Sequence, residues 1–440
     1  MNGGEKMSKL YNKIIEKKAI IGVMGLGYVG LPLAVEKARA GYKVIGFDIQ
    51  QKRVDMINNG QNYIGDVQDE ELEELVKKNK LTATTNFDKL SKCDVVSICV
   101  PTPLDKFKQP DLSYIIQTSK DIAKRLHKEQ LIILESTTYP GTTEEIVLPI
   151  LLETGLKVGE DFYLAFSPER VDPGNIRYKT RNTPKVVGGI TKECTKHAKA
   201  LYENVLDAPV FPVSSPKAAE MAKILENTFR LVNIALVQEM TKVAEKMNVN
   251  IWEVIDAAAT KPFGYMPFYP GPGIGGHCIP IDPFYLSYKA REYDLHLMLV
   301  EQAGQVADEM PYYVVQRLGD ILNKYKKPFN GSKILVLGVA YKGNIDDMRE
   351  SPALKVIEIL EEKKANISYF DPFIPSFELN GKKYHSIKLE KERLKEFDGA
   401  IITTAHTVGI DYNLIVENVP FVFDTKNILK NLKKNNVFVL

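Results

Sequence analysis

The chain of 440 residues is short of cysteine, tryptophan and histidine, of which it has four, one and six. The cysteines lie far apart and form neither CxxC pairs nor metal-ligand spacings: they are Cys93, Cys99, Cys194 and Cys278. This pattern argues against a disulfide framework and against a metal site, because both need paired or clustered cysteines. A reducing cytoplasm is the compartment that fits best.

The chain also has no large excess of positive or negative charge, and it has no long hydrophobic run. Its 58 lysines and arginines stand against 56 aspartates and glutamates. Such a balance argues against nucleic-acid and membrane-surface partners, and it leaves room for a local basic pocket that binds phosphates. The N-terminal segment is too polar for a signal peptide, and no run of about 18 apolar residues occurs elsewhere. We therefore expect a soluble protein.

The length exceeds what one hydrophobic core usually supports, so two or three domains are expected. Strand and helix patterns alternate in the first and last parts of the chain, whereas the middle is helical. We predict an α/β fold with two Rossmann-like doubly wound sheets, joined by a long central helix and an all-α middle domain. The predicted domains are 1–213, 214–327 and 328–440.

A dinucleotide-binding fingerprint opens the first domain. An apolar strand at 19–24 runs into the sequence Gly25-Leu26-Gly27-Tyr28-Val29-Gly30, and a helical pattern follows at 32–39. The three glycines allow a tight turn, close approach of a pyrophosphate and packing of helix on strand, while Asp48 after the next strand can bind ribose hydroxyls. A carboxylate at this position favours NAD over NADP. Arg53 leaves a question open, because it could bind the extra phosphate of NADP or lie along the adenosine.

Three later strands end in polar residues. The strand at 95–100 ends in Pro101-Thr102-Pro103, the strand at 131–135 in Ser136-Thr137-Thr138, and the strand at 163–166 leads into Ser167-Pro168-Glu169-Arg170. Ligands of doubly wound sheets bind beyond the carboxyl ends of the strands, so these side chains are candidate ligand contacts. The alternative is that the hydroxyls serve only turns and caps.

A helix of about 50 Å is predicted at 216–248, because this segment has no internal proline or glycine. Apolar residues occur on nearly every face, which indicates burial between domains or between subunits. One stripe on its first turns is polar: Glu220, Lys223, Asn227 and Arg230. This stripe is either a solvated face or the contact of a polar ligand, since a lysine and an asparagine on a buried helix need partners.

A glycine- and proline-rich loop, YPGPGIGGHCIPIDP at 269–283, interrupts the helical region. Regular structure is excluded there, so the backbone must approach something closely. Its thiol, Cys278, is a candidate nucleophile, and Asp282 places a carboxylate within reach if the chain turns between them. The alternative is a cysteine that merely packs as a small hydrophobic residue.

From residue 333 the alternation of strands and helices returns. A strand at 334–337, a glycine-flanked turn at 338–343, a helix at 351–362 and a strand at 367–370 ending on Asp371 repeat the order of the first domain. We interpret this as a second, degenerate nucleotide-binding sheet, in which Lys342 and Arg349 supply positive charge. The alternative is a duplicated sheet that binds nothing.

These motifs, in this order and spacing, resemble the UDP-sugar 6-dehydrogenases of the UDP-glucose/GDP-mannose dehydrogenase family. The matching segments are GLGYVG with Asp48, VPTP at 100–103, Ser136-Thr137, Ser167-Pro168-Glu169, the Lys223/Asn227 helix, GGHCIPID and YKGNIDDMRES at 341–351. The resemblance covers roughly residues 20–424. It implies oxidation of a nucleotide-linked sugar alcohol to the uronic acid with two NAD, with NAD held by 1–213, UDP held by 328–440, and dimerisation and the catalytic loop in 214–327.

The resemblance also implies roles for individual residues. The implied catalytic residues are the nucleophile Cys278, with Lys223, Asp282, Asn227, Glu169 and Thr137. The implied NAD contacts are Gly25, Gly27, Tyr28, Val29, Gly30, Asp48, Arg53, Thr102, Ser136, Thr137 and Arg349. The implied substrate contacts are Glu169, Arg170, Lys223, Asn227, Tyr269, Gly271, Gly273, Gly275, Tyr341 and Lys342. No metal is implied.

The sequence GPGIGGHCIPIDPFYL resembles the branch that acts on UDP-N-acetylhexosamines. Ile281 stands where the UDP-glucose branch usually has a lysine, and FGYMPFYPGPG at 263–273 lacks the arginine that many members place upstream of the glycine loop. UDP-N-acetylglucosamine is thus the expected substrate, with UDP-N-acetylmannosamine and UDP-glucose as alternatives, in polysaccharide biosynthesis. The chain is expected to form at least a homodimer. The competing classes are a one-step β-hydroxyacid dehydrogenase and an NAD-sensing regulator, of which the latter lacks a basic DNA-binding helix.

Overall fold

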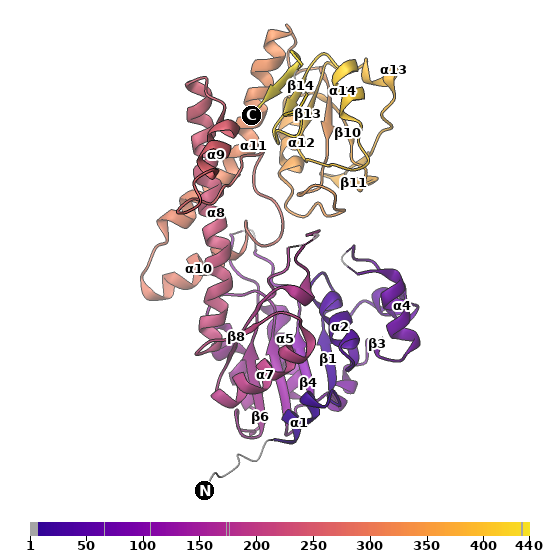
Figure 1. The fold of residues 1–440 in the computed structure, drawn as a ribbon, viewed down its shortest axis with the longest axis vertical. Helices are drawn as coiled ribbons and strands as arrows, with labels where there is room; N and C mark the ends of the chain where they lie inside the picture. The colour runs from indigo at the N-terminus through magenta and orange to yellow at the C-terminus, as the bar shows by residue number, and fades with distance from the viewer. Residues whose placement is uncertain (1–7, 66, 106, 173, 176, 433) are drawn as a thin grey trace. The chain divides into compact units, whose positions relative to one another are not determined.

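The computed structural model describes the chain except for residues 1–7, 66, 106, 173, 176 and 433. Its internal contacts divide the chain into two compact units. The first unit runs to Glu226 and also takes in Tyr288–Leu295, and the second comprises Asn227–Ser287 and His296–Leu440. Figure 1 shows a sheet in each of them, indigo to magenta in the first and orange to yellow in the second. The division into three domains at 213/214 and 327/328 stays a prediction.

The first unit is built on an eight-stranded sheet with the order β3-β2-β1-β4-β5-β6-β7-β8. Its strands are β1 Ile20–Met24, β2 Lys43–Phe47, β3 Leu81–Thr84, β4 Val95–Ile98, β5 Gln130–Leu134, β6 Phe162–Phe166, β7 Lys185–Gly189 and β8 Val210–Pro212. All pairs are parallel except β6 with β7. The direction of winding reverses between β1 and β4, and the crevice at such a point is where doubly wound sheets bind ligands.

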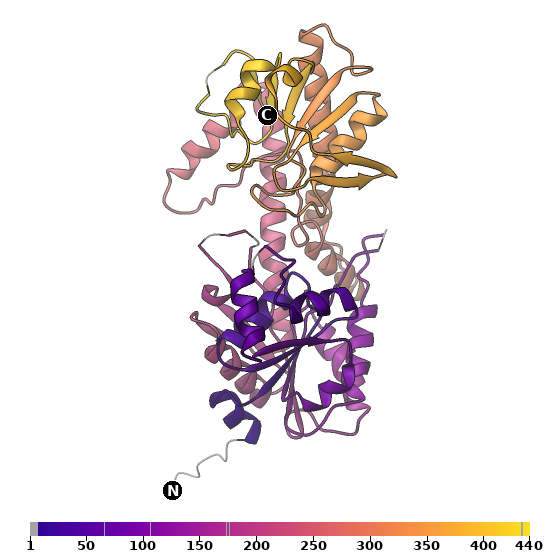
Figure 2. The same cartoon turned by 90° about the vertical axis from the view of Figure 1, so that its right-hand side faces the viewer.

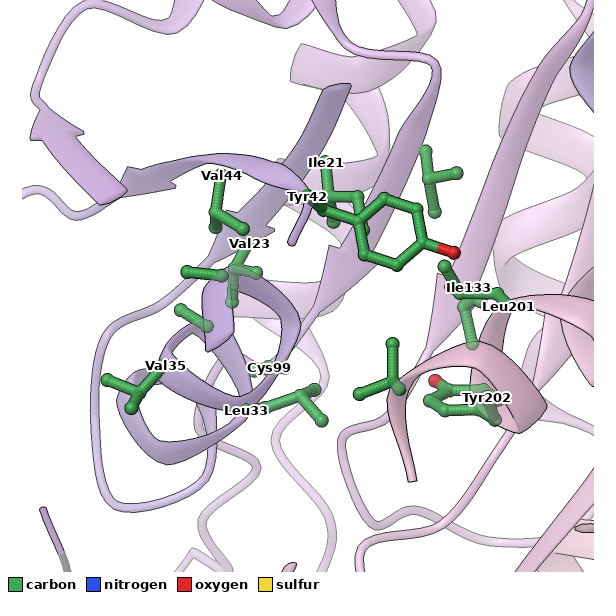
Figure 3. Packing of buried hydrophobic residues seen from close by; sticks show 14 of the residues in the cluster. Ile21, Val23, Leu33, Val35, Tyr42, Val44, Cys99, Ile133, Leu201 and Tyr202 are labelled. Atoms are coloured by element: carbon green, nitrogen blue, oxygen red, sulfur yellow. The ribbon is translucent and has the colours of Figure 1, made fainter. Parts of the chain in front are cut away.

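Helices cover both faces of this sheet (Figure 2). The helices are α1 Lys9–Ile15, α2 Gly30–Arg39, α3 Gln51–Asn58, α4 Asp69–Lys77, α5 Ser113–Ala123, α6 Leu148–Leu152 and α7 Lys192–Val205, with short non-α turns at Phe87–Lys92, Thr143–Val147 and Thr180–Asn182. Burial on both faces explains why the strands read as continuous apolar runs. Figure 3 shows this core, in which Val44 of β2 lies near Val23 of β1, Leu33 of α2 lies near Cys99, and Tyr202 comes from α7.

The second unit carries a five-stranded parallel sheet with the order β10-β9-β13-β14-β15. Its strands are β9 Lys333–Leu337, β10 Asn366–Phe370, β13 Gly399–Ile402, β14 Val422–Asp424 and β15 Val437–Val439, and a hairpin is formed by β11 Ser376–Leu379 and β12 Lys382–His385. The remaining helices are α8 Pro216–Lys246, α9 Ile251–Ala259, α10 Asp282–Ala290, α11 Met298–Lys324, α12 Pro352–Glu362, α13 Lys391–Leu394 and α14 Tyr412–Asn418, with a 3₁₀ turn at Arg291–Tyr293. Two Rossmann-like sheets with a helical middle region therefore confirm the predicted fold class.

The long helix α8 buries polar side chains and exposes apolar ones. Glu220, Lys223 and Asn227 are each less than a tenth exposed, whereas Leu225 is 65% and Leu236 54% exposed. Within a single chain the polar stripe is buried and these apolar residues are exposed, so the expected burial of the apolar faces between domains or between subunits stays a prediction. Among the described residues, no helix is both long and apolar enough to cross a membrane.

A buried network of charges lies beneath the carboxyl edge of the first sheet. The ammonium group of Lys37 is 3.2 Å from one carboxylate oxygen of Glu135, and that of Lys185 is 3.1 Å from the other. Lys37 also donates to the Ser97 hydroxyl, and Lys185 lies 3.4 Å from Glu169. Burial alone would raise the pKa of Glu135, but the two lysines hold it down to about 2. The network therefore keeps a carboxylate ionised inside the core.

Replacing Lys185 by methionine should destabilise the first unit and make it more sensitive to acid. Removal of one partner from a buried ion pair costs about 3 kcal/mol or more. A depressed carboxyl pKa contributes stability above about pH 4.3, which is lost as the pH falls through the folded-state pKa. With one cation gone, the pKa of Glu135 rises, so Lys185→Met should lose its fold at a higher pH than the unchanged protein, as measured by circular dichroism and urea unfolding.

Lys289 offers a matched control for this prediction. Its side chain is also buried and paired, with Glu145 and Glu292, but these carboxylates are 38% and 52% exposed. Water can solvate them when the lysine is removed, so Lys289→Met should cost about 1 kcal/mol or less. Equal losses in the two variants would contradict a special role for the network.

The three glycines of the fingerprint differ in what surrounds them. A Cβ on Gly30 would lie 1.8 Å from the carbonyl oxygen of Gly25, and Gly25 itself has a φ of +86°. A Cβ on Gly27 would meet no atom within 4 Å. Gly25 and Gly30 therefore shape the turn between β1 and α2, whereas Gly27 leaves open space beside it, which fits the close approach of a pyrophosphate.

Alanine substitution should separate these two roles. Gly30→Ala should lower the unfolding free energy by about 3 kcal/mol because the added methyl overlaps a backbone oxygen. Gly27→Ala should leave the melting temperature unchanged and weaken NAD binding by about 10-fold or more, because the methyl occupies the space of the pyrophosphate. Thermal unfolding and calorimetric titration with NAD measure the two effects, and unchanged NAD affinity in Gly27→Ala would contradict this assignment.

Candidate active site

Asp48 lies at the carboxyl end of β2 and braces the glycine turn. One of its carboxylate oxygens accepts the backbone N–H of Leu26 at 3.0 Å, and Arg53 lies 3.5 Å from the same oxygen. The Arg53 guanidinium also lies over the ring of Tyr63, whose hydroxyl donates to the Leu26 carbonyl. The arginine is therefore paired with the acid that is expected to bind ribose, and this arrangement fits NAD better than NADP.

The hydroxyls at the ends of β4 and β5 connect these two strand ends. Thr102 donates to the carbonyl of Thr137 at 2.7 Å, and Ser136 donates to the carbonyl of Val100 at 2.7 Å. Thr102 and Ser136 are buried, while Thr137 is half-buried. The hydroxyls thus serve the turns, as the alternative interpretation held, and they also gather Thr102, Ser136 and Thr137 at one edge of the sheet. Their contacts with NAD stay predictions.

Glu169 is held after β6 by its own loop and by the buried network. One carboxylate oxygen accepts the N–H groups of Arg170 and Val171, and the other lies 3.4 Å from the ammonium of Lys185. The Arg170 guanidinium pairs with Glu226 of α8 at 2.6 Å. Glu169 is thus fixed in position next to a cation, and the predicted contact of Arg170 with a substrate stays a prediction.

The polar stripe of α8 divides into residues with different partners. Glu220 accepts the N–H groups of Gly141 and Thr143 and the hydroxyl of Thr143, so it caps the turn at Thr143–Val147. Burial raises the pKa of Glu220 to about 7, although these donors act in the opposite direction. Arg230 is exposed. Lys223 is 7% exposed, and its ammonium makes no hydrogen bond or ion pair among the described residues of its own unit.

Asn227 and Asp282 are joined by a hydrogen bond in the second unit. The Asn227 amide donates to the Asp282 carboxylate at 2.5 Å, and both side chains are less than 5% exposed. Asp282 begins α10, where a negative charge is stabilised by the helix N-terminus. Lys223 lies one helical turn before Asn227 on α8. Three of the predicted catalytic residues therefore belong to two short stretches of chain.

Cys278 shares a tight turn with Asp282. The Cys278 carbonyl accepts the N–H groups of Ile281 and Asp282, at 3.1 and 2.8 Å, so the chain does turn between the thiol and the carboxylate. Cys278 is half-buried, whereas Cys93, Cys99 and Cys194 are buried. Burial raises the pKa of Cys93 to about 12 and raises that of Cys99. Among the four thiols, Cys278 is thus the least buried, and its role as a nucleophile stays a prediction.

The glycine loop before Cys278 packs on the second sheet's first turn. A Cβ on Gly275 would lie 2.7 Å from the Cβ of Tyr341, and one on Gly276 would lie 2.9 Å from the Tyr341 ring. A Cβ on Gly273 would lie 2.8 Å from Pro352. Residues this close can only be glycines, so the loop and the predicted UDP contacts Tyr341 and Lys342 occupy one region of the second unit.

Arg349 lies beside this loop and is clamped by a residue that the sequence reasoning missed. Two of its nitrogens lie 2.6 to 3.0 Å from the Asp347 carboxylate, and Asp347 is 5% exposed. The Arg349 carbonyl accepts the N–H of Gly276 at 3.3 Å. Its predicted contact with NAD stays a prediction.

Sequence reasoning also missed the partners that position the predicted residues. These are Lys37, Glu135 and Lys185 around Glu169, Asp347 beside Arg349, and Trp252 and Asp256 beside Tyr269. Charged residues inside apolar segments were the available signal for the first three. Their pairing needs the tertiary structure, since Glu135 and Lys185 are distant in the sequence.

Three consecutive parts of the chain match one family. Residues 19–206 match the UDP-glucose/GDP-mannose dehydrogenase family, NAD binding domain; residues 217–309 match its central domain; and residues 335–431 match its UDP binding domain. Together these matches cover most of the chain, and the first contains the glycine turn while the second contains Cys278.

Similar proteins agree with this assignment. The UDP-N-acetyl-D-glucosamine 6-dehydrogenase of Pseudomonas aeruginosa is 36% identical over 414 residues, which cover 94% of this chain and 96% of that protein. The UDP-N-acetyl-D-mannosamine dehydrogenase of Pyrococcus horikoshii is 38% identical over 80% of this chain and 84% of its own length. The solved structure of UDP-D-ManNAc dehydrogenase from the same organism has a TM-score of 0.86 at 33% identity and covers 96% of this chain and 98% of that one.

The glycine turn with Asp48, the Cys278–Asp282 turn beside Asn227, and the second nucleotide-binding sheet thus lie in the segments that the family matches cover. The chain belongs to the UDP-glucose/GDP-mannose dehydrogenase family and is an NAD-dependent oxidoreductase of the UDP-sugar 6-dehydrogenase type.

Proposed function

We propose that this enzyme oxidises the C6 hydroxymethyl group of UDP-N-acetylglucosamine to the carboxylate, with two NAD per sugar and a covalent intermediate on Cys278. The observation that supports the proposal is the turn in which the carbonyl of the half-buried Cys278 accepts the N–H of Asp282, whose carboxylate is bound by Asn227. A one-step alcohol oxidation needs no such thiol. In an oxidation to the acid the thiol has a use, because an aldehyde can give up a second hydride only after a nucleophile has added to it, either water to form the hydrate or a thiol.

We further propose how the chain divides the work. The segment 1–213 holds NAD, 328–440 holds UDP, and 214–327 supplies the catalytic loop and the subunit contact. Asp48, Gly27 and the hydroxyls at the ends of β4 and β5 contact NAD, together with the neighbouring residues predicted from the sequence. Bound NAD accepts a hydride in each of the two oxidations.

In the first oxidation, the chain must stabilise an alkoxide and remove a proton. The buried ammonium of Lys223 stabilises the negative charge that develops on the C6 oxygen, and Asn227 orients the same oxygen. Asp282, directly or through water held by Thr137, accepts the proton. A carboxylate that already accepts a hydrogen bond from Asn227 is oriented for this role.

The thiolate of Cys278 then adds to the aldehyde carbon and gives a thiohemiacetal. The second oxidation converts this adduct to a thioester, and water activated by Asp282 or Glu169 hydrolyses it to the acid and the free thiol. An ordinary thiol has a pKa of about 8.5, and the cation of Lys223 favours the thiolate. The need for a reduced thiol supports a cytoplasmic location.

The choice of N-acetylglucosamine is supported by a relative that acts on this sugar and by the residue before Asp282. Ile281 is apolar, so the chain has no charge at the position where the UDP-glucose branch usually has a lysine. UDP-N-acetylmannosamine is the second candidate, because several relatives bear its name, including the Pyrococcus horikoshii enzyme at 38% identity. UDP-glucose is the third candidate substrate within the family.

Counting NADH against sugar tests the proposed reaction. With UDP-N-acetylglucosamine in limiting amount, two NADH should form per sugar, and UDP-N-acetylmannosamine and UDP-glucose should react with a kcat/KM at least about 10-fold lower. One NADH per sugar would indicate a simple alcohol dehydrogenase, and a preference for UDP-N-acetylmannosamine would replace the substrate but keep the chemistry.

Cys278→Ser tests the covalent step in the same assay: it should bind UDP-sugar and NAD normally and lose turnover by about three orders of magnitude. The control is Cys194→Ser, because Cys194 is buried and its sulfur accepts the N–H of Leu164, a bond that a serine hydroxyl can keep. A fully active Cys278→Ser would remove the covalent step.

We also propose that the enzyme is a homodimer formed through α8. Exposed apolar residues follow one face of α8 from Phe229 onward and continue just past its end, at intervals of 7, 4, 3 and 4: Phe229, Leu236, Met240, Val243 and Met247. This is the a/d spacing of a helix that packs along another helix. Asn233 occupies the one polar position in the seam, where an asparagine typically fixes register. A second copy of the same face satisfies this pattern by two-fold symmetry.

A charge introduced into this seam should separate the subunits. Leu236→Asp should halve the molar mass measured by light scattering without unfolding the protein, since the residue is 54% exposed in the single chain. Val408→Asp serves as the control, because Val408 is 61% exposed but lies outside the seam. A Leu236→Asp protein that keeps the mass of a dimer would place the interface elsewhere.

A further inference from the structure

The start of the glycine loop is attached to helix α9 (Ile251–Ala259) by two contacts. The ring of Trp252 stacks on that of Tyr269, with centroids 5.6 Å apart and planes inclined by 14°. The Tyr269 hydroxyl donates to the Asp256 carboxylate at 2.8 Å. Trp252 and Asp256 are four residues apart, so one face of α9 holds both the ring and the hydroxyl of the same tyrosine.

Trp252 is itself fixed from the opposite side. It is 7% exposed, and its indole N–H donates to the carbonyl of Leu440 at 2.9 Å, next to β15 (Val437–Val439). Ala244, Ile251 and Ile255 pack around it, and Val439 lies against the same cluster. These contacts hold the Trp252 indole in place. The ring of Tyr269, which stacks on the indole, is therefore positioned by Trp252.

The remainder of the loop is packed against the second sheet rather than against α9. A Cβ on Gly271 would lie 2.8 Å from the ammonium of Lys426, which follows β14, while Gly273 contacts Pro352 and Gly275 contacts Tyr341. Four glycines within six residues have a large conformational entropy when they are not held. The stack of Tyr269 on Trp252 thus holds the start of the glycine loop, while close packing of its glycines holds the middle of the loop.

We propose that Trp252 is a positioning residue for the nucleotide sugar, which pre-orders the 269–275 segment through Tyr269 before the ligand binds. This inference rests on the proposed function only in taking that segment as the part that wraps the UDP-sugar. When the loop is already ordered, ligand binding does not have to offset the entropy lost on ordering it. The affinity for the UDP-sugar is therefore higher than it would be with a disordered loop. The chemistry at Cys278 uses other residues, and therefore Trp252 acts on binding and not on turnover.

Removal of the indole should raise KM and leave kcat nearly unchanged. Trp252→Leu keeps an apolar side chain in the cluster but removes the stack and the N–H, and it should raise KM for the UDP-sugar and Kd for UDP by about 5- to 10-fold. Trp252→Phe restores a ring and should recover most of this loss. Steady-state kinetics measure KM and kcat, and calorimetry with UDP alone measures binding without turnover.

The chain supplies a reporter and a matched control. Trp252 is the single tryptophan of the sequence, so saturating UDP should change the emission of the unchanged protein. Phe377 stacks on Tyr384 in the β11–β12 hairpin of the same unit, with centroids 4.9 Å apart. Phe377→Leu loses a comparable stack and comparable stability, but it should leave KM and UDP affinity unchanged.

The outcomes distinguish this inference from the proposed function. If two NADH form per sugar while Trp252→Leu keeps the UDP affinity and KM of the unchanged protein, the inference is wrong and the function stands. If Trp252→Leu and Phe377→Leu raise KM equally, the effect is a loss of stability alone and the inference is wrong. If no UDP-sugar is oxidised but UDP changes the Trp252 emission and binds more weakly to Trp252→Leu, the inference stands and the function fails.

Discussion

The candidate site depends on one hydrogen bond, from the amide of Asn227 to the carboxylate of Asp282. This bond ties the long helix α8 to the start of α10, and the carbonyl of Cys278 closes the turn that precedes it. Both partners are almost completely buried, so the bond is shielded from competition by water. The backbone turn that carries both Cys278 and Asp282 is therefore anchored to a buried contact.

Helix α8 reverses the usual distribution of polar and apolar side chains. Its inward face carries polar side chains that cap a turn or bind the catalytic turn, and its outward face carries the apolar seam. An amphipathic helix usually buries its apolar face. The reversal in α8 is understandable when the polar face serves the substrate and the apolar face serves a second subunit. A single helix then links assembly to the geometry of the proposed site.

The first sheet also buries charged side chains, which pair with one another. Lys37, Glu135 and Lys185 form an alternating series that ends at Glu169, so a carboxylate at the strand end is held by cations beneath it. Such a buried network is weak evidence for stability but strong evidence for a fixed geometry, because each member can be satisfied in only one arrangement. The loops above the sheet thereby have a rigid support.

The sequence by itself determined the fold class, the glycine turn with its acid, and the identity of the loop that carries Cys278. These are local signals: glycine spacing, strand-to-helix order and apolar periodicity act over a few residues. The structure that such short-range patterns produce can be predicted from the sequence alone. Only the tertiary structure decided which side of α8 is buried, that Arg53 pairs with Asp48, and that Trp252 holds Tyr269. Each of these depends on contacts between segments that meet only after folding, and a pattern along the chain contains no information about which of several possible partners a side chain will reach.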